Sequence, residues 1–367
     1  MTEFPILQFG ASRFLQAHVD LFVSEALPRG EAMGRIAVAG TTGSAESRRR
    51  IGAFAGGKPY PVLVKGLRDG AVVDEIVEVK SVGAGVDAAT QWDELERLFI
   101  AARCAVSNTA DRGYETDPND RPDAGPPRSF PAKLARLLLA RCRAGADPIT
   151  LFPCELTPGN GQVLRGVVLD MLDRWQAPAT ARRWVGEECL WVNSLVDRIV
   201  SEPLEPLGAV AEPYALWAIE DQPGLELPCR HPAIVVAADL KPYERLKLFI
   251  LNLGHTYLAE IWREGGAPDL TVREAVADTH MRAKLDALYA EEVLPVFAAI
   301  GMGDEAQAYL RTVIERLSNP FLDHRLSEIL INHEAKKQRR FGGLIALAKT
   351  HGAGIKLPRL EAALARG

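Results

Sequence analysis

The stretch Pro5–Leu27, PILQFGASRFLQAHVDLFVSEAL, predicts a strand, a tight turn and a helix in immediate succession. A short apolar run, Pro5–Phe9, meets Gly10, and the apolar residues after the glycine recur at helical spacing. These residues are Phe14, Leu15, Val19, Phe22, Val23 and Leu27. A dinucleotide-binding domain places the pyrophosphate of its cofactor at such a turn, against the N-terminus of the helix. The stretch therefore favours an α/β fold of that type.

The glycine fingerprint of this turn is incomplete. The pattern G-x-G-x-x-G reads GASRFL from Gly10 to Leu15, so the second and third glycines are replaced. Ser12 is nevertheless small enough to let the backbone approach a phosphate. We therefore predict cofactor contacts from Gly10, Ser12, Arg13 and Phe14, and the alternative is an ordinary turn of an α/β protein.

The run Arg35–Gly40, RIAVAG, predicts a second strand, and the residues after it bear on the choice of cofactor. NAD-selective sites usually place an acid here to hold the ribose hydroxyls, whereas NADP sites use hydroxyl and guanidinium groups. This chain has the hydroxyl-rich segment Thr41–Ser44 and then Arg48–Arg50, with no acid at the strand end. We therefore predict a cofactor contact from Thr41 and expect NADP(H) to bind at least as well as NAD(H).

Further apolar runs have the character of strands. Tyr60–Gly66 and Val72–Ser81 flank the turn signal Arg68–Gly70 and so predict a hairpin. Ala102–Val106 and Pro148–Pro153 each predict a single strand. Between them, residues 111–129 are rich in Pro, Gly and Asp and predict a loop. The first part of the chain therefore alternates strands with helices, which favours a sheet covered by helices.

The pattern becomes almost entirely helical from Lys241 onward, so we place a domain boundary near Asp239. The expected fold is α/β, with a Rossmann-type dinucleotide-binding domain over residues 1–239. A mostly α-helical substrate and catalytic domain would follow over residues 240–367. We expect the active site in the cleft between the two domains.

Lys241–Glu260, KPYERLKLFILNLGHTYLAE, reads as a buried helix that carries reactive polar side chains. At 100° per residue its apolar residues form an arc around Leu246, and the opposite side carries Lys247, Asn252 and His255. That opposite side is itself largely apolar. Burying an unpaired amide costs roughly 1–3 kcal/mol, so such groups persist where partners or a function hold them. The alternative is that Lys247 extends to solvent and His255 caps a neighbouring carbonyl.

The composition is that of an ordinary soluble protein. Of 367 residues, 47% are hydrophobic and 25% are charged, and the formal net charge of −5 supplies no basic field for nucleic acid. The basic runs Arg48–Arg50 and Lys336–Arg340 are typical of solvated surface. The five cysteines show neither metal spacing nor a disulfide framework. The N-terminus resembles neither a signal peptide nor a membrane span, so we expect a cytoplasmic protein without a membrane partner.

The order Lys247, Asn252, His255 in a K-x4-N-x2-H-[ST] frame resembles the active-site helix of the long-chain mannitol dehydrogenase family. That family includes polyol dehydrogenases, mannonate oxidoreductases and tagaturonate reductases, also called altronate oxidoreductases. The words KPYER and LN-x-x-HT most resemble the tagaturonate reductase branch. The resemblance implies that Lys247 is the general acid/base, and that Asn252 and His255 position and polarise the reacting oxygen. A desolvated lysine has a lowered pKa and can accept an alcohol proton.

Other words of the chain extend the resemblance over nearly its whole length. SNT at 107–109 and PCEL at 153–156 imply cofactor contacts from Ser107, Asn108, Thr109 and Glu155. Leu156 departs from the family, in which mannitol dehydrogenases have an asparagine that donates to the oxyanion.

The words NG, N-[ST]-[LM]-VDRI and NP-x-x-x-H imply substrate contacts in the same way. They point to Asn160, Asp197, His324 and Lys336, although Asp197 could equally be a buried partner of Arg198.

The resemblance implies an oxidoreductase that uses NAD or NADP and moves hydride to or from a sugar acid such as a hexuronate or aldonate, without a metal. A carboxylate gives buried cations a charge-assisted role. Lys336 is the best candidate for that contact, because twelve helical residues separate it from His324 by about 120° net. Arg325 and Arg339 are weaker candidates. The alternatives are a neutral polyol dehydrogenase and, given Ser12 and Leu156, a catalytically silent nucleotide-binding protein. The oligomeric state is left open.

Overall fold

The computed structural model describes residues 3–109, 113–266, 268–352 and 354–366. Its chain divides into two compact units. The first comprises Met1–Val64, Glu75–Ala211 and Ala215–Leu240, and the second comprises Lys65–Asp74, Glu212–Tyr214 and Lys241–Gly367. The predicted boundary at 239/240 lies beside this division. Two short segments from the N-terminal part, however, belong to the second unit.

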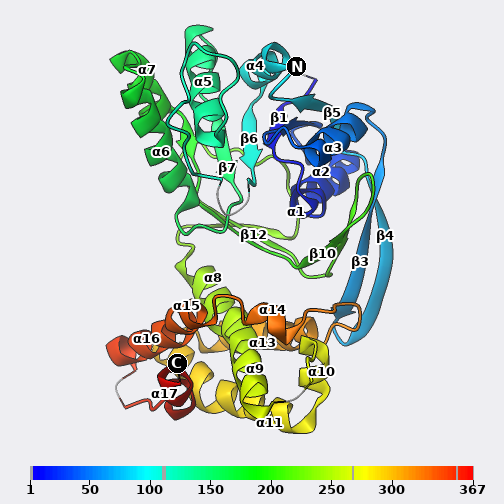
Figure 1. Cartoon of the computed structure of the whole chain (residues 1–367), viewed down its shortest axis with the longest axis vertical. Coiled ribbons are helices and arrows are strands. Elements are labelled where there is room, and N and C mark those ends of the chain that lie inside the picture. Colours follow the sequence, from blue (N-terminus) through cyan, green and yellow to red (C-terminus); the bar gives the residue numbers. More distant parts are fainter. Residues whose placement is uncertain (1–2, 110–112, 267, 353, 367) are drawn as a thin grey trace. The chain divides into compact units, whose positions relative to one another are not determined.

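The first unit is built on a six-stranded sheet whose paired strands all run parallel (Figure 1). In spatial order the strands are β5 (Val82–Asp87), β2 (Ile36–Gly40), β1 (Ile6–Phe9), β6 (Cys104–Ser107), β7 (Thr150–Pro153) and β8 (Leu190–Trp191). Numbered within the sheet by chain position, they follow the order 3-2-1-4-5-6 of doubly wound dinucleotide folds. The central strand β1 is buried along its whole length, as its apolar run predicts.

Helices cover both faces of this sheet. One apolar cluster joins alternate strand residues, among them Leu7 and Phe9, to helices α4, α5 and α6. Gln8 of β1 points to the other face, where it lies beside Asp20 of α2. The helices of this unit are α1 (Arg13–Gln16), α2 (Val19–Ala26), η1 (Leu27–Arg29), α3 (Ala45–Ala55), α4 (Trp92–Ala101), α5 (Phe130–Arg143), α6 (Asn160–Arg174), α7 (Ala179–Arg183) and η2 (Trp184–Glu188).

The chain also forms two smaller sheets. The first orders β10 (Val200–Pro203), β11 (Ala209–Ala211), β3 (Tyr60–Arg68) and β4 (Ala71–Val79), and the second orders β13 (Ile234–Ala237), β12 (Leu216–Glu220) and β9 (Ser194–Asp197). Asp69 and Gly70 connect β3 to β4 with φ angles of 52° and 76°. Positive φ at both central residues is the requirement of a type I′ turn, which Asp-Gly meets. The predicted hairpin is therefore present.

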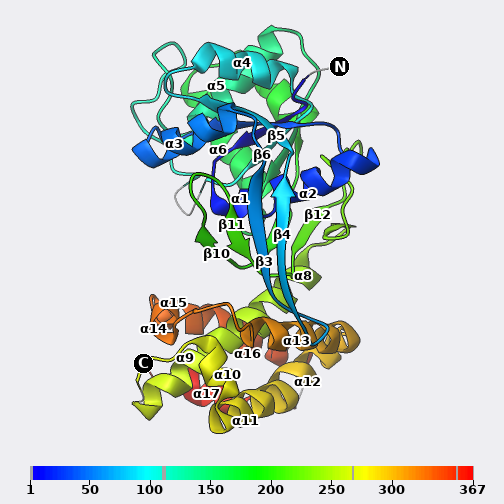
Figure 2. The same ribbon diagram turned by 90° about the vertical axis from the view of Figure 1, so that its right-hand side faces the viewer.

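From residue 241 onward the second unit is helical, and the polar stretch Lys241–Gly265 forms one nearly continuous helix (Figure 2). The helices are α8 (Lys241–Leu246), η3 (Lys247–Asn252), α9 (Leu253–Gly265), α10 (Val272–Ala277), α11 (Thr279–Leu288), η4 (Tyr289–Val293), α12 (Leu294–Ala299), α13 (Gly303–Leu317), α14 (Leu326–Ile329), α15 (His333–Lys337), η5 (Gln338–Gly342), α16 (Gly343–His351) and α17 (Pro358–Ala365). Segments η3, η4 and η5 are π-helical. Their apolar faces share one core that includes Ile250, Leu253 and Leu258.

The tip of the β3–β4 hairpin belongs to the second unit, where it forms polar contacts with α13 and with the residues after it. Glu315 accepts a hydrogen bond from the backbone of Gly70 at 2.7 Å, and the amide of Asn319 donates to the carbonyl of Lys65 at 3.1 Å. The segment Glu212–Tyr214 is held to α13 in the same way, because buried Arg316 donates hydrogen bonds of 2.9 and 2.8 Å to the carboxylate of Glu212. These contacts join residues far apart in sequence, so local patterns do not reveal them.

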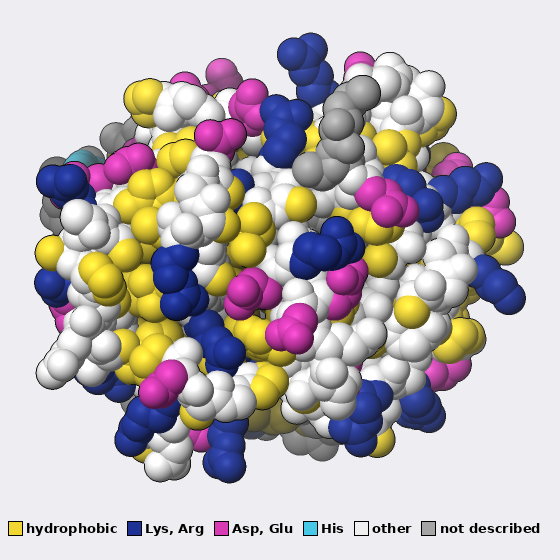
Figure 3. Space-filling model, turned by 90° about the horizontal axis from the view of Figure 1, so that it is seen from above, with side chains coloured by type: hydrophobic (Ala, Val, Ile, Leu, Met, Phe, Trp, Pro, Cys, Tyr) yellow, Lys and Arg dark blue, Asp and Glu magenta, His cyan; other side chains and the backbone are white. Residues whose placement is uncertain are grey.

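Neither the helices nor the surface charges seen in Figure 3 indicate a membrane span or a strongly charged face in the described part of the chain. Among the described residues, no helix combines the length and apolarity needed to cross a bilayer. On the face shown in Figure 3, Lys and Arg side chains are interspersed with Asp and Glu. The described part of this face therefore presents no extended field of one sign.

Candidate active site

The turn after β1 fits the close approach of a dinucleotide backbone. Gly10 has a φ of +108°, and a Cβ added there would lie 2.5 Å from the carbonyl oxygen of Asn108. Only glycine can occupy this position. Ser12 caps α1 by accepting from the backbone of Leu15 at 3.2 Å, and its hydroxyl donates to the side chain of Asn108 at 3.2 Å. The predicted strand and turn are present, but the predicted single helix is interrupted at Ala17 and His18.

Four predicted cofactor contacts gather at the carboxyl ends of β6 and β7, around the buried carboxylate of Glu155. Glu155 accepts hydrogen bonds from the hydroxyl of Ser107 at 3.1 Å, from the Thr109 hydroxyl at 3.0 Å and from the Thr109 backbone at 3.1 Å. The amide of Asn108 donates to the carbonyl of Cys154 at 2.8 Å. Burial raises the pKa of Glu155, while these hydrogen bonds oppose the rise. Glu155 therefore fixes the loop after β6, and its contact with a cofactor stays a prediction.

Tyr114 belongs to the same cluster, although sequence patterns gave no signal for it. Its hydroxyl lies 3.1 Å from Glu155 and 3.2 Å from the carbonyl of Asn160. The tyrosine sits in the predicted loop 111–129, of which Asp111 and Arg112 lie outside the described residues.

Asn160, predicted to contact substrate, is fully buried and holds backbone groups together. Its Nδ2 lies within 3.0 Å of the carbonyls of Pro153, Glu155 and Ser194. Its Oδ1 accepts from the backbones of Gly161 and Ser194, each at 2.9 Å. These bonds occupy both ends of the amide, because two hydrogens and two lone pairs are its capacity. In this structure Asn160 holds the backbone at the start of α6, and its contact with substrate stays a prediction.

Thr41 and the arginines expected to favour NADP lie in and after the loop that follows β2. Arg48 donates to the carbonyl of Gly43, and Arg50 forms an ion pair with Glu46 at 2.7 Å. No acid stands at the end of β2, but one stands at the end of the adjacent strand, because Asp87 ends β5 in register with Gly40. Its Oδ1 accepts from the backbone of Ala89 at 2.9 Å.

Asp197 and Leu156 complete the predicted positions of the first unit. Asp197 ends β9 and is buried, and the neighbouring Arg198 donates to the carbonyl of Ala17. Leu156 is 68% exposed, so it is not a core residue. The predicted contact of Asp197 with substrate stays a prediction.

In the second unit, the segment from Lys247 to Asn252 is π-helical, which changes the face that these residues share. A 100° wheel separates Lys247 and Asn252 by about 140°. A π-turn closes from residue i to i+5 and so takes one residue more than an α-turn, which brings residues five apart towards the same side. The 100° wheel therefore does not apply across this segment, and a π-turn is expected to bring positions 247 and 252 closer to one side of the helix than the wheel does.

Side chains satisfy three consecutive carbonyls at the end of the π-helical segment. Tyr289 donates to the carbonyl of Ile250 at 2.8 Å, and Nδ1 of His255 lies 3.0 Å from that of Leu251. The carbonyl of Asn252 accepts from the hydroxyl of Thr256 and from Arg340, each at 3.1 Å. Distortions of this kind occur where other donors replace the regular helix bonds.

Gly254 admits Tyr289 to this helix, because a Cβ at Gly254 would lie 2.0 Å from the tyrosine oxygen. The word LNLGHT from 251 to 256 thus contains the glycine and two of the donors that stabilise the π-turn.

His255 is buried and neutral at physiological pH. Burial, assisted by the nearby His324, Arg316 and Arg340, lowers the pKa of His255 to about 3, although its hydrogen bond to the carbonyl of Leu251 opposes the shift. A carbonyl can only accept, so Nδ1 carries the hydrogen and Nε2 keeps a lone pair. The alternative in which His255 caps a carbonyl is therefore seen, and one ring nitrogen remains to accept a hydrogen bond.

The predicted pair His324 and Lys336 lies near this histidine, although not for the reason given by the wheel. The His324 ring lies 5.3 Å from that of His255. Lys336 is close enough to contribute to the lowered pKa of His324. The helix between them is broken, with Asn332 at a φ of 56°, so a continuous 100° wheel does not apply.

The basic run from Lys336 to Arg340 is only partly solvated surface. Lys337 is fully buried, and Lys336 and Arg340 are half-buried. Arg339 is exposed. The prediction of a solvated run is therefore wrong for most of these residues, and Arg340 was missed as a candidate.

Two family models match the chain over most of its length. The model of the mannitol dehydrogenase Rossmann domain matches residues 5–228, and that of the mannitol dehydrogenase C-terminal domain matches residues 239–366.

Curated relatives carry the name altronate oxidoreductase. The protein of Bacillus subtilis (strain 168) is 32% identical over 365 residues, which cover 92% of this chain and 74% of that protein. The protein of Klebsiella pneumoniae subsp. pneumoniae is 31% identical over 332 residues, which cover 83% and 68%.

Two solved structures share the fold. Substrate-free D-sorbitol dehydrogenase superposes with a TM-score of 0.83 at 21% identity, over 98% of this chain and 79% of that one. Mannitol 2-dehydrogenase of Pseudomonas fluorescens, in a ternary complex with NAD and D-mannitol, gives 0.76 at 20% identity over 99% and 79%. At these identities the likeness concerns the fold, and it confirms the expected α/β class with a helical C-terminal part.

Proposed function

Because this chain belongs to the mannitol dehydrogenase family, whose members are oxidoreductases, we propose that it transfers hydride between NAD(P) and a secondary alcohol or ketone of a sugar acid. The observation that supports the proposal most is the π-helical form of Lys247–Asn252, which turns residues five apart towards one side, together with the buried, neutral His255 that follows it. The altronate oxidoreductases at 31–32% identity support a sugar acid as substrate.

The three residues of the second unit have distinct roles in this proposal. In the oxidative direction the amine of Lys247 removes the hydroxyl proton, while the carbon loses its hydrogen as hydride. The amide of Asn252 donates to the developing alkoxide, and Nε2 of His255 accepts a hydrogen bond that orients the substrate. The bound nicotinamide supplies the hydride acceptor. Reduction runs the same roles in reverse, and a mechanism without a metal stays a prediction.

The substrate class is tested by a panel of aldonates, hexuronates and neutral polyols, each assayed with both cofactors. We expect turnover of pairs such as altronate/tagaturonate or mannonate/fructuronate, and little of mannitol, arabinitol or sorbitol. Turnover of the neutral polyols alone would replace the sugar-acid proposal by the polyol dehydrogenase alternative. Cofactor binding without turnover of any substrate would favour the silent nucleotide-binding alternative.

The cofactor preference is tested by fluorescence titration with NADH and NADPH. We expect NADPH to bind at least as tightly, because hydroxyl groups from Thr41 to Ser44 follow β2 where an NAD site usually has an acid. A clear preference for NADH would contradict this prediction. It would point instead to Asp87, which ends the adjacent strand in register with Gly40.

A further inference from the structure

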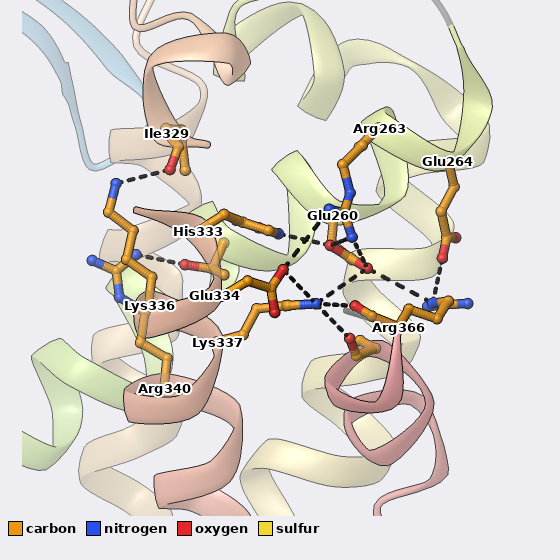
Figure 4. Close-up of polar contacts among 12 residues, drawn as sticks. Glu260, Arg263, Glu264, Ile329, His333, Glu334, Lys336, Lys337, Arg340 and Arg366 are labelled. Atoms are coloured by element: carbon orange, nitrogen blue, oxygen red, sulfur yellow. Dashed lines mark hydrogen bonds and ion pairs between the residues drawn. The ribbon is translucent and has the colours of Figure 1, made fainter. Parts of the chain in front are cut away.

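We propose that Arg340, together with Lys336, binds the carboxylate of the substrate and so selects sugar acids over neutral polyols. The inference rests on the proposed function, which it deepens by assigning the residue that recognises the acid. Arg340 lies in η5 and Lys336 one turn earlier in α15 (Figure 4).

Neither cation has an acidic partner among the described residues. Nζ of Lys336 donates to the carbonyl of Ile329 at 2.8 Å. Nη1 of Arg340 donates to the carbonyl of Asn252 at 3.1 Å and to the hydroxyl of Thr256 at 2.5 Å. Glu328 raises the pKa of the neighbouring His324, but it forms no ion pair with either cation in the described part of the chain.

The neighbouring cations of the same unit are paired, which makes the contrast visible in Figure 4. Lys337 lies 3.1 Å from Glu334 and 3.9 Å from Glu260, and Arg263 lies 3.0 Å from Glu260. Arg366 lies 2.6 Å from Glu264. The chain thus supplies acids to cations on one side of α15 and leaves Lys336 and Arg340 without them.

Two half-buried cations side by side are unfavourable unless an anion joins them. Burial and the charge of Arg340 lower the pKa of Lys336, and burial with the charge of Arg339 lowers that of Arg340 to about 10. A bound anion would remove this repulsion and replace lost hydration. The guanidinium carries five N–H donors, of which the two contacts above use one nitrogen, so a planar edge is left for a carboxylate.

The position of Arg340 connects this anion site to the reacting centre. The bond from Nη1 to the carbonyl of Asn252 holds the guanidinium beside the residue that donates to the alkoxide in the proposed reaction. A short sugar acid has its carboxylate a few bonds from the reacting hydroxyl, so both groups would be held by neighbouring side chains. A rigid fork suits this task better than a flexible ammonium.

The test compares Arg340→Gln and Arg340→Lys with the matched control Arg339→Gln, an exposed arginine one residue away. Each protein is assayed with D-altronate and D-mannonate, and with the neutral polyols D-altritol and D-mannitol. We expect Arg340→Gln to lower kcat/KM for the aldonates on the order of 10- to 100-fold, mainly through KM. The neutral polyols should change much less, Arg340→Lys should be intermediate, and Arg339→Gln should resemble the wild type.

Equal losses on acids and polyols in Arg340→Gln would overturn the inference, because Arg340 would then only support the carbonyl of Asn252. Where polyol turnover is too low to measure, calorimetric titration with altronate and altritol in the presence of reduced cofactor replaces it, and the variant should lose altronate binding selectively. A wild type that turns over polyols but no aldonate would refute the proposed function itself. A wild type that prefers a polyol phosphate would overturn the assignment of a carboxylate.

Discussion

Replacing Lys247 by alanine should lower kcat on the true substrate by roughly 10²–10⁴-fold, the usual contribution of a general acid/base group. The affinity for the reduced cofactor should stay unchanged in a fluorescence titration, because the predicted cofactor contacts belong to the first unit and Lys247 to the second. Lys247→Arg should be nearly as inactive, since a guanidinium keeps the charge but does not give up its proton.

Lys349→Ala is the matched control for the alanine variant, because it removes an exposed lysine from α16 of the same unit. Near wild-type turnover in Lys247→Ala would show that another group moves the proton. Activity retained in Lys247→Arg alone would show that Lys247 acts through its charge and not as a base.

The first unit was predictable because its signals are local. The apolar run that ends at Gly10 becomes the buried β1, and Asp69-Gly70 becomes the turn of the hairpin. Contacts across long sequence distances were not predictable. The hairpin tip belongs to the second unit because Asn319 and Glu315 bind its backbone, at sequence separations of 254 and 245 residues.

The candidate site was predictable in its residue types and not in its geometry. Lys247, Asn252 and His255 were found by spacing, but a 100° wheel assumes a regular helix. The π-turn depends on Tyr289 and Arg340, which reach it from other helices. Arg340 was overlooked because a run of basic residues looks solvated in sequence, and only the fold shows which of its members lack acids.

The turn at Gly10 is in contact with a polar cluster made of Gln8, Asp20 and Tyr60, in which Asp20 is fully buried. Its Oδ2 accepts from the hydroxyl of Tyr60 at 2.7 Å. Its Oδ1 and the Oε1 of Gln8 are both acceptors that receive no hydrogen bond in the described part of the chain. Rotating the Gln8 amide would give up the bond from Nε2 to the carbonyl of Gly10, which measures 3.3 Å. A proton on Oδ1 of Asp20, donated to Gln8, satisfies both oxygens at once.

The stability of the protein should therefore fall between about pH 4 and pH 7 through Asp20. Burial raises the pKa of Asp20 from 3.8 to about 7, with the hydrogen bond from Tyr60 opposing the rise. The folded state then binds the proton more tightly than the unfolded state, so this contribution is complete below about pH 4 and lost above about pH 7. The loss is on the order of 4 kcal/mol.

Asp20→Asn should remove this dependence, because its amide donates to Gln8 at every pH and its oxygen still accepts from Tyr60. In urea unfolding between pH 4.5 and 8.5, the free energy of unfolding of Asp20→Asn should rise relative to wild type up to about pH 7 and then stay level. The exposed Asp93→Asn on α4 is the matched control and should follow the wild type. Parallel curves for wild type and Asp20→Asn would mean that Asp20 is ionised in the folded protein. The bond from Gln8 to the carbonyl of Gly10 would then not depend on a proton at Asp20.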